Sequence, residues 1–357
     1  MKNTIKLLNV LLCSALTAGC LVDPDLKLDY SGFEPPEVAD GWELSTPEAE
    51  GLDPDRIDKV YQKLFSEDAF PTVRSLLVVR HGKLVAEGYS RDSRDLDRLH
   101  NLQSATKSIT SMLVGAALGE GALTTVDEPL FQLMPDYFDS DVRKRAITIR
   151  DVLTMKTGLE FDDDVDTAPL IYSGGSSVQQ VLWRRLVAEP GSRFYYHSGN
   201  PQLLAGLVRE VAGATLAQYA QDHLFGPLGI TRYQWEHHAD GLSFGGFGLW
   251  LRPRDMARIG LLMLRGGAWE GRQLVPRSWI QESTRVHANG NYGYYWWIME
   301  GERRYRAGGD GGQIIYVDEV NDLVIVVTGD PACKDWIMSP GIITTLFSGI
   351  YDAIVGP

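Results

Sequence analysis

Apolar and polar residues are arranged along this chain so that strands are expected near both ends and helices between them. Residues 73–90 (VRSLLVVRHGKLVAEGYS) are two β-rich runs around a His-Gly pair, which is typical of a hairpin because glycine supplies the positive φ of the turn. Three further β-rich runs lie at 303–309, 313–318 and 322–330. The pattern predicts a sheet assembled from two distant parts of the chain.

Helical patterns account for much of the remainder. Asp53 and Pro54 are the residue types that favour the N-cap and first position of a helix over residues 53–65. A nearly continuous apolar run at 102–121 (LQSATKSITSMLVGAALGEG) predicts a long buried helix. Other helices are expected at 147–156, 176–188, 201–213, 216–229, 253–264, 276–284 and 341–356.

These elements predict an α/β (α+β) fold, in which an antiparallel sheet flanked by helices is built from both chain ends and a mostly helical domain is inserted. We expect the α/β domain to comprise residues 46–122 and 243–357. The helical domain is expected at residues 123–242.

The first residues have the pattern of an export signal. Lys2 and Lys6 precede a short apolar run that ends in small residues, as in a secretory signal peptide, here over residues 1–19. The run is shorter than the roughly 20 apolar residues that a membrane-spanning helix needs. Residues 20–45 are rich in Pro and Asp and have no apolar period, which predicts a tether.

The signal ends in LTAGC, which resembles a bacterial lipobox. This resemblance implies lipidation of Cys20, and Leu21 at the next position favours the outer membrane. The mature protein is therefore expected to be exported to the cell envelope and anchored by its lipid to the outer membrane, facing the periplasm. Secretion without a lipid, after cleavage near Ala18, is the alternative.

The net charge and the cysteines indicate what the protein does not bind and how its fold is not stabilised. A net charge of −13, without a Lys/Arg run that would form a basic patch, argues against nucleic acid. Of the three cysteines, Cys13 leaves with the signal and Cys20 is the lipid candidate. Only Cys333 remains for the folded part, so no internal disulfide is expected and stability must come from the core.

Ser104 and Lys107 lie three residues apart at the head of the predicted helix 102–121, so their side chains can meet on one face. The free N–H groups and the dipole of a first helical turn favour negative charge developing at Ser104. A lysine among apolar neighbours is desolvated and can accept a serine proton. The pair predicts a nucleophile with its base; a chance pair at a helix boundary is the alternative.

Two other stretches offer partners for such a pair. Tyr196, two residues before Ser198 in PGSRFYYHSGN (190–200), is a candidate phenolate base, or else part of an aromatic core. The glycine-rich run around Asp310 (RYRAGGDGGQIIYV, 304–317) allows backbone to approach a substrate and offers an N–H to an oxyanion, or else forms a β-turn.

Other chemistries lack the residues they need. The G-x-S-x-G, H-E-x-x-H and Walker motifs are absent. His237 and His238 are adjacent rather than at metal-ligand spacing. The acidic run EFDDDVD (160–166) predicts a solvated loop. A weaker hypothesis from this run is that the substrate carries an amine, attracted by Asp162, Asp163 and Asp164.

Taken in order, these stretches resemble the serine β-lactamase and penicillin-binding-protein-like hydrolases, in the branch of class C β-lactamases and family VIII esterases. The resemblance runs from WELSTPEAEGLD (42–53) to the last helix, through SATKSITSMLVG (104–115), PGSRFYYHSGN and GGDGGQIIYV. Within that family, Tyr-x-Ser-Gly at 196–199 and GxGGQ at 309–313 are most similar to 6-aminohexanoate-dimer-hydrolase-like proteins. The resemblance implies a β-lactamase/transpeptidase-like fold.

The resemblance implies that Ser104 is the acylated nucleophile, Lys107 its base partner and Tyr196 the second proton carrier. Two motifs depart from the β-lactamase pattern: Ser198 stands in place of Asn, and Arg306-Ala307-Gly308 replaces Lys-Thr-Gly in one register. In the GxGGQ register the oxyanion N–H comes from Asp310 instead, and both registers stay open. Candidates for binding substrate or oxyanion are Ser198, Asn200, Gly308, Gly309 and Asp310.

The expected function is a serine hydrolase that cleaves a small-molecule ester or amide through an acyl-enzyme, without a metal or organic cofactor. The two departures argue against efficient β-lactam hydrolysis. A β-lactamase or D-amino-acid peptidase is one alternative, and a non-hydrolytic penicillin-binding-like envelope protein is another.

Overall fold

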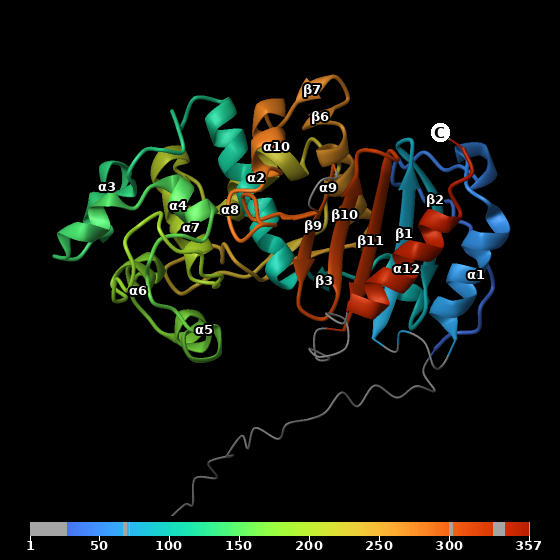
Figure 1. Cartoon of the computed structure of the whole chain (residues 1–357), viewed down its shortest axis with the longest axis horizontal. Helices are drawn as coiled ribbons and strands as arrows, with labels where there is room; N and C mark the ends of the chain where they lie inside the picture. The colour runs from blue at the N-terminus through green and yellow to red at the C-terminus, as the bar shows by residue number, and fades with distance from the viewer. Residues whose placement is uncertain (1–26, 67–69, 71, 300–302, 331–339, 357) are drawn as a thin grey trace, which may run out of the picture.

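Strands from the two ends of the chain form one six-stranded antiparallel sheet. The computed structural model describes residues 27–66, 70, 72–299, 303–330 and 340–356. The strand order is β2-β1-β11-β10-β9-β8, so the N-terminal hairpin joins the C-terminal strands where β1 pairs with β11 (Figure 1). The strands are β1 Val73–Arg80, β2 Lys83–Tyr89, β8 Trp297–Met299, β9 Arg304–Gly309, β10 Gln313–Asp318 and β11 Leu323–Gly329. The predicted sheet built from both chain ends is confirmed.

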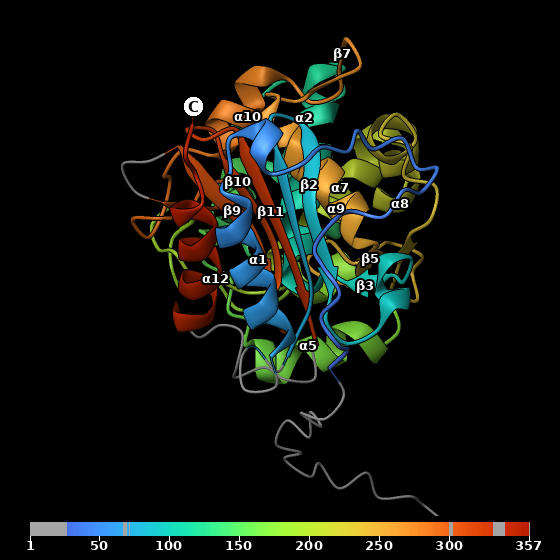
Figure 2. The ribbon, with the colours of Figure 1, turned by 90° about the vertical axis from the view of Figure 1, so that its right-hand side faces the viewer.

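Both faces of this sheet are covered by helices, and its central strands are therefore apolar on both sides. Helices α1 (Pro54–Phe65) and α12 (Pro340–Asp352) lie on one face, and α9 (Pro253–Leu264) lies on the other (Figure 2). In β1, Leu76 and Val78 pack in the core beneath α1, whereas Leu77 and Val79 pack in the core that contains α9. This is the period-two alternation of a strand that is buried on both faces.

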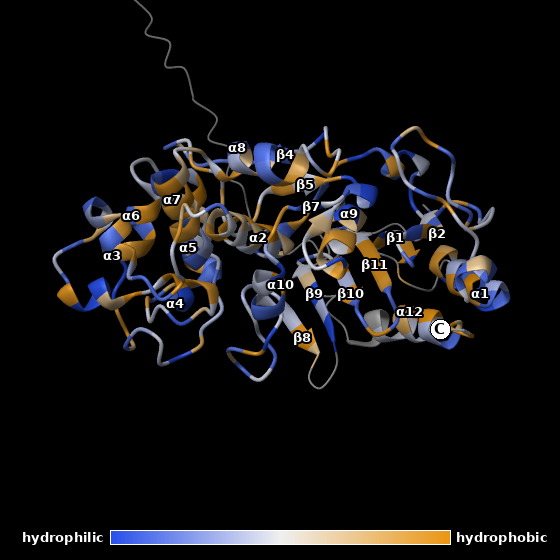
Figure 3. Ribbon diagram, turned by 90° about the horizontal axis from the view of Figure 1, so that it is seen from above, coloured by the Kyte–Doolittle hydropathy of each residue, from blue (hydrophilic) through white to orange (hydrophobic). Residues whose placement is uncertain are grey.

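Helix α2 (Thr106–Gly119) separates the sheet from a helical region (Figure 1). Every residue of α2 from Thr106 to Ala117 is buried, because α7, α8 and α10 pack against it on several sides and β9 reaches its first turns. Figure 3 shows how apolar α7 and β11 are, in contrast to the hydrophilic outer side of α1. The helices of this part are α3 Leu130–Leu133, α4 Ile149–Leu153, α5 Asp163–Tyr172, α6 Ser177–Leu182, α7 Asn200–Ala212 and α8 Leu216–Ala220. Helix α10 (Arg277–Ser283) comes from the C-terminal part of the chain and also packs against α2.

Shorter elements connect these layers. A single π-helical turn, Gln221–Phe225, continues α8. The 3₁₀ turns are η2 Glu48–Glu50, η3 Ser93–Leu96, η4 Gln103–Ala105, η5 Pro135–Tyr137 and η6 Val142–Ala146. A small antiparallel sheet is formed by β3 His100–Asn101, β5 Leu249–Leu251 and β4 Gln234–Trp235, and a two-stranded ribbon by β6 Ala268–Trp269 and β7 Arg272–Gln273.

Local sequence signals of the first elements are confirmed. The Asp53 carboxylate caps α1 by accepting the N–H groups of Asp55 and Arg56, and Pro54 occupies the first helical position. The turn between β1 and β2 consists of His81 and Gly82, both with positive φ (51° and 81°), as a tight hairpin turn requires. The inserted helical region is also confirmed, while its exact limits of 123–242 stay a prediction.

Two expectations are wrong. The acidic run 160–166 is not a loop throughout, because α5 begins within it at Asp163. The predicted tether, residues 20–45, packs against the domain in its described part, from residue 27 onward. Phe33 is buried and its carbonyl accepts the N–H of Glu87, and Leu84 exchanges backbone hydrogen bonds with Glu43 and Ser45, so this segment covers the edge strand β2.

The signal peptide, the lipidation site Cys20 and the remaining Cys333 lie outside the described residues. Within the described ranges, no helix combines the length and the apolar character needed to cross a membrane.

Candidate active site

Ser104 lies in a strained turn at the entrance to α2. It occupies η4, the 3₁₀ turn that leads into α2, and is half-buried. Gln103, directly before it, has a φ of 48°, which is uncommon for any residue but glycine. The N–H of Gln103 is held by the side chain of Asn101 at 2.9 Å. Backbone held in such a conformation beside a candidate nucleophile is typical of functional sites.

Lys107 follows Ser104 by one turn, and its side chain is almost completely buried, with 1% of its surface exposed. Its Nζ lies 2.8 Å from Ser104 Oγ, 3.2 Å from the carbonyl oxygen of Gly246 and 3.3 Å from Ser198 Oγ. Among the residues that the structure describes, no carboxylate forms an ion pair with it. The amine is therefore held by neutral oxygen atoms, and its Nζ lies within hydrogen-bond distance of the hydroxyl whose proton a base would take.

The carbonyl of Gly246 reaches Lys107 because the segment around it passes very close to other backbone. A Cβ on Gly245 would lie 2.1 Å from the carbonyl oxygen of Pro201, and the Gly245 carbonyl accepts the hydroxyl of Thr110 at 2.8 Å. Only glycine fits such an approach. The contact between Gly246 and Lys107 was not predicted from the sequence, although the Gly-Gly pair at 245–246 indicates a close approach of backbone.

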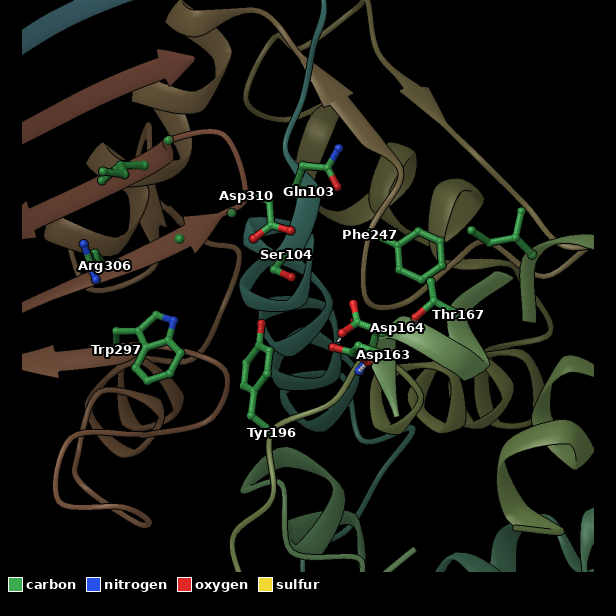
Figure 4. A pocket seen from close by; sticks show the side chains of 16 residues that line it. Gln103, Ser104, Asp163, Asp164, Thr167, Tyr196, Phe247, Trp297, Arg306 and Asp310 are labelled. Atoms are coloured by element: carbon green, nitrogen blue, oxygen red, sulfur yellow. Dashed lines mark hydrogen bonds between the residues drawn. The ribbon is translucent and has the colours of Figure 1, made fainter. Parts of the chain in front are cut away.

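Tyr196 stands beside Lys107. The lysine Nζ lies 4.9 Å from the centre of the Tyr196 ring, and the phenolic oxygen points toward Ser104 (Figure 4). The ring is held edge-on to Tyr292, with centroids 6.0 Å apart, and tilted against Trp297 at 5.7 Å. The structure thus brings together the three residues predicted to carry the chemistry.

Of the two polar residues predicted after Tyr196, the structure brings only one to the site. Ser198 contacts Lys107 and lines the pocket. Asn200 is fully buried at the start of α7, where its amide oxygen accepts the hydroxyl of Thr157 at 2.8 Å and its nitrogen contacts Met155 Sδ. Asn200 does not line the pocket, so its role is to hold α7 in place rather than to face a substrate.

His197, between Tyr196 and Ser198, supports this turn from beneath. Its Nδ1 accepts the backbone N–H groups of Gly199 and Asn200 at 3.2 and 3.3 Å, which requires a neutral ring with its proton on Nε2. Burial, and secondarily the charge of Lys107, lower the pKa of His197 to about 3. The ring stacks on Phe161 at 5.1 Å.

The glycine-rich run forms the hairpin between β9 and β10 and closes the site from the side of the sheet. Gly308, Gly309 and Asp310 all line the pocket together with Ser104. A Cβ on Gly309 would lie 2.1 Å from the carbonyl oxygen of Leu102, so the end of β9 lies directly against η4. Glycine is therefore needed at this position, as the sequence analysis expected of a backbone that approaches closely.

Ser104 opens into a pocket of about 530 Å³ between β9 and α5. The wall formed by α5 carries the carboxylates of Asp163 and Asp164, and the wall formed by β9 and the turn after it carries Arg306 and Asp310 (Figure 4). Burial lowers the pKa of the Arg306 guanidinium, whose Nε has no hydrogen-bond partner among the described residues. The other side chains of the lining are Gln103, Thr167, Ile171, Tyr196, Ser198, Phe247, Trp297 and Ile314.

Comparison with known proteins places this arrangement in a family. The family model described as Beta-lactamase matches residues 57–329, which is most of the chain. This chain belongs to the β-lactamase family. It is therefore a serine hydrolase of the group that contains esterases and amidases, as the resemblance of its motifs implied.

Individual relatives within the β-lactamase family are distant. The 6-aminohexanoate-dimer hydrolase of Paenarthrobacter ureafaciens is 26% identical over 298 residues, 73% of this chain and 74% of that protein. A Bacillus anthracis structure provisionally assigned as a 6-aminohexanoate-dimer hydrolase has a TM-score of 0.72 at 19% identity, covering 93% of this chain and 91% of its own. A family VIII carboxylesterase has a TM-score of 0.68 at 14% identity, covering 87% and 98%. At these identities the two structural likenesses show a shared fold alone.

Proposed function

We propose that this protein hydrolyses an ester or amide through an acyl-enzyme formed on Ser104, with Lys107 and Tyr196 as the proton carriers. The contact of 2.8 Å between Lys107 Nζ and Ser104 Oγ carries the proposal, because a buried amine beside a hydroxyl is the arrangement that activates a serine. Tyr196, with its phenolic oxygen directed at Ser104, supports it.

In the proposed reaction Ser104 Oγ bonds to the substrate carbonyl carbon while its proton passes to Lys107. The oxyanion is stabilised by the N–H of Ser104 and by an N–H from the end of β9, at Gly309 or Asp310. Tyr196 relays the proton to the leaving alcohol or amine as its bond to the carbonyl carbon breaks. Water then adds to the ester on Ser104, and the acid product leaves with the serine restored.

The direct test is covalent labelling of Ser104 by a fluorophosphonate probe, measured by intact-protein mass and peptide mapping. Ser104→Ala is expected to abolish the adduct. Ser198→Ala is the matched control, because it removes a neighbouring hydroxyl but keeps the nucleophile, and it is expected to remain labelled. An adduct that persists in Ser104→Ala would contradict the proposal.

Esters and amides are preferred here over β-lactams. Ser198 replaces the Asn of the β-lactamase pattern, and in one register Arg306 with Ala307 replaces the Lys-Thr pair that precedes Gly308. We expect hydrolysis of short-chain p-nitrophenyl esters to exceed that of nitrocefin by a large factor in kcat/KM. Comparable rates would favour the β-lactamase or D-amino-acid peptidase alternative, and the absence of a burst with any activated ester would favour a non-hydrolytic binding protein.

If the substrate carries an amine, Asp164 is the aspartate best placed to bind it. Asp162 caps α5, and the Asp163 carboxylate accepts a hydrogen bond from Ser198. The Asp164 carboxylate lines the pocket without a hydrogen bond to another described side chain. If the substrate carries an ammonium group, Asp164→Asn should raise KM for an aminoacyl p-nitroanilide and leave KM for a neutral analogue of equal length unchanged. Equal effects on both substrates would remove the hypothesis.

Location in the cell envelope rests on residues 1–20 alone. We propose export and lipidation at Cys20, as the lipobox-like LTAGC suggests. Metabolic labelling with an alkyne fatty acid should mark the wild-type protein and not Cys20→Ser. Release of the wild-type protein into the soluble fraction, without label, would instead support cleavage near Ala18.

A further inference from the structure

Asp163 connects the acidic start of α5 to the catalytic lysine through Ser198. One carboxylate oxygen accepts the backbone N–H of Ser198 at 2.7 Å, and the other accepts its hydroxyl at 3.2 Å. Ser198 Oγ in turn lies 3.3 Å from Lys107 Nζ. A chain of contacts therefore runs from Asp163 through Ser198 and Lys107 to Ser104.

The number of hydrogens on each group decides which atom donates and which accepts in these contacts. A serine hydroxyl has one hydrogen, and here it is directed at Asp163, so toward Lys107 the Ser198 oxygen can only accept. The carbonyl of Gly246, 3.2 Å from Nζ, is also an acceptor only. In the uncharged form that acts as the base, the lysine amine has two hydrogens and one lone pair. With both hydrogens taken by these acceptors, the lone pair is left for Ser104.

We propose that Asp163 is a positioning residue, which keeps the hydroxyl of Ser198 turned away from Lys107 and so directs the lysine lone pair at Ser104. Asp163 does not touch the reacting atoms itself. Without its carboxylate, the hydroxyl of Ser198 would donate to the lone pair of Lys107, which is the electron pair that must take the proton of Ser104. This inference rests on the function proposed above.

Asparagine at position 163 is the sharpest probe of this role. If its amide oxygen accepts the N–H of Ser198, its NH₂ group must face Ser198 Oγ and donate to it. The turn then stays anchored and the size is kept, but the hydroxyl hydrogen of Ser198 is released toward Lys107. We expect Asp163→Asn to lower kcat and the burst rate with a neutral p-nitrophenyl ester by about 10- to 100-fold, which is less than the full loss of a general base, and to change KM less than about threefold.

A double-mutant cycle with Ser198→Ala distinguishes positioning from a general loss of charge or structure. Ser198→Ala removes the group that would compete for the lone pair, so its own effect should be smaller than that of Asp163→Asn. Asp163→Asn combined with Ser198→Ala should be as active as Ser198→Ala alone, which makes the double variant faster than Asp163→Asn. Multiplied effects of the two substitutions would overturn the inference.

Glu160→Gln is the matched control for charge on the same acidic run. Glu160 is exposed, pairs with Arg185 and does not line the pocket, so its loss should leave kcat and KM unchanged. Failure of the two proposals can be told apart. Wild-type rates in Asp163→Asn, with Ser104→Ala inactive, would overturn only the role of Asp163, whereas labelling that persists in Ser104→Ala would overturn the acyl-enzyme itself.

Discussion

At the scale of single residues, Lys107 is an amine that is almost completely buried beside the proposed nucleophile. Three neutral oxygens surround Nζ, and no described carboxylate pairs with it. Placing a lysine in such surroundings costs folding free energy, because water solvates an amine better than a few fixed dipoles do. The residue is therefore explained by its function rather than by its contribution to stability.

Replacing Lys107 by methionine should separate activity from stability. We expect Lys107→Met to lower the acylation rate by at least about 100-fold, because the base is lost. The midpoint of thermal unfolding should stay the same or rise, since an apolar chain of similar length replaces a desolvated amine. Stopped-flow burst kinetics and calorimetry measure the two quantities, and a large drop in the midpoint would contradict this account.

His197 predicts a loss of stability in acid. Its ring is neutral in the folded protein down to a pKa of about 3, whereas in the unfolded chain it takes up a proton near pH 6.5. As the pH falls from about 6.5 toward 3, the unfolded state binds the extra proton, so the free energy of unfolding decreases, by an upper bound of about 5 kcal/mol.

The matched variant for this prediction is His197→Asn, which can still accept the N–H groups of Gly199 and Asn200 but does not titrate. Urea denaturation at several pH values should show a shallower acid loss in this variant than in the wild type. Parallel curves for the two proteins would show that other groups cause the loss.

At the scale of elements, glycines decide where the strand β9 and the turn η4 meet. Gly309 lies against the carbonyl of Leu102, whereas a Cβ on its neighbour Gly308 would find its nearest atom, on Trp297, at 3.7 Å. The two glycines therefore differ in what they tolerate, although they are adjacent on the same strand. This contact sets the width of the site between Ser104 and the sheet.

Alanine at these two positions should have different effects on stability. Gly309→Ala forces β9 away from η4 and is expected to cost about 1–3 kcal/mol of unfolding free energy, as overpacking does. Gly308→Ala meets only ordinary van der Waals contact and should cost less than about 1 kcal/mol. Chemical denaturation of the pair measures the difference, and equal costs would contradict the assigned contact.

Helix α5 shows how local sequence reasoning about an element failed. Three aspartates in a row favour a solvated loop when they are counted as charges, but Asp162 is also a good N-cap. Asp163, Asp164 and Asp166 then lie in the first turn, where the helix dipole favours negative charge. The cluster that looked like a loop is therefore the start of a helix, and it brings carboxylates to the pocket.

At the scale of the whole molecule, one hydrophobic core continues from the sheet into the helical region. Leu77 and Val79 of β1 belong to the same buried cluster as Val181 of α6 and Leu207 of α7, with the apolar residues of α2 between them. The second cluster, beneath α1 and α12, is confined to the opposite face of the sheet. The site between the two parts is therefore held by shared packing rather than by a flexible hinge.

A shared core predicts that the sheet and the helical region unfold together. Far-UV circular dichroism and tryptophan fluorescence should give coincident thermal transitions, because the two parts cannot separate without exposing α2. Two resolved transitions would show instead that the helical region is an independent folding unit.

Several features followed from the sequence by itself because they depend on neighbours along the chain. Ser104 and Lys107 meet because residues three apart lie one turn apart where the 3₁₀ turn η4 leads into α2, and the caps and hairpin turn depend on a few adjacent residues. Only the tertiary structure decided that Asp163 reaches Ser198, that Gly246 holds Lys107 and that Asn200 lies outside the pocket. These contacts join segments that are distant in sequence, and which of them form depends on how α2, α5, α7 and β9 pack, which no local pattern specifies.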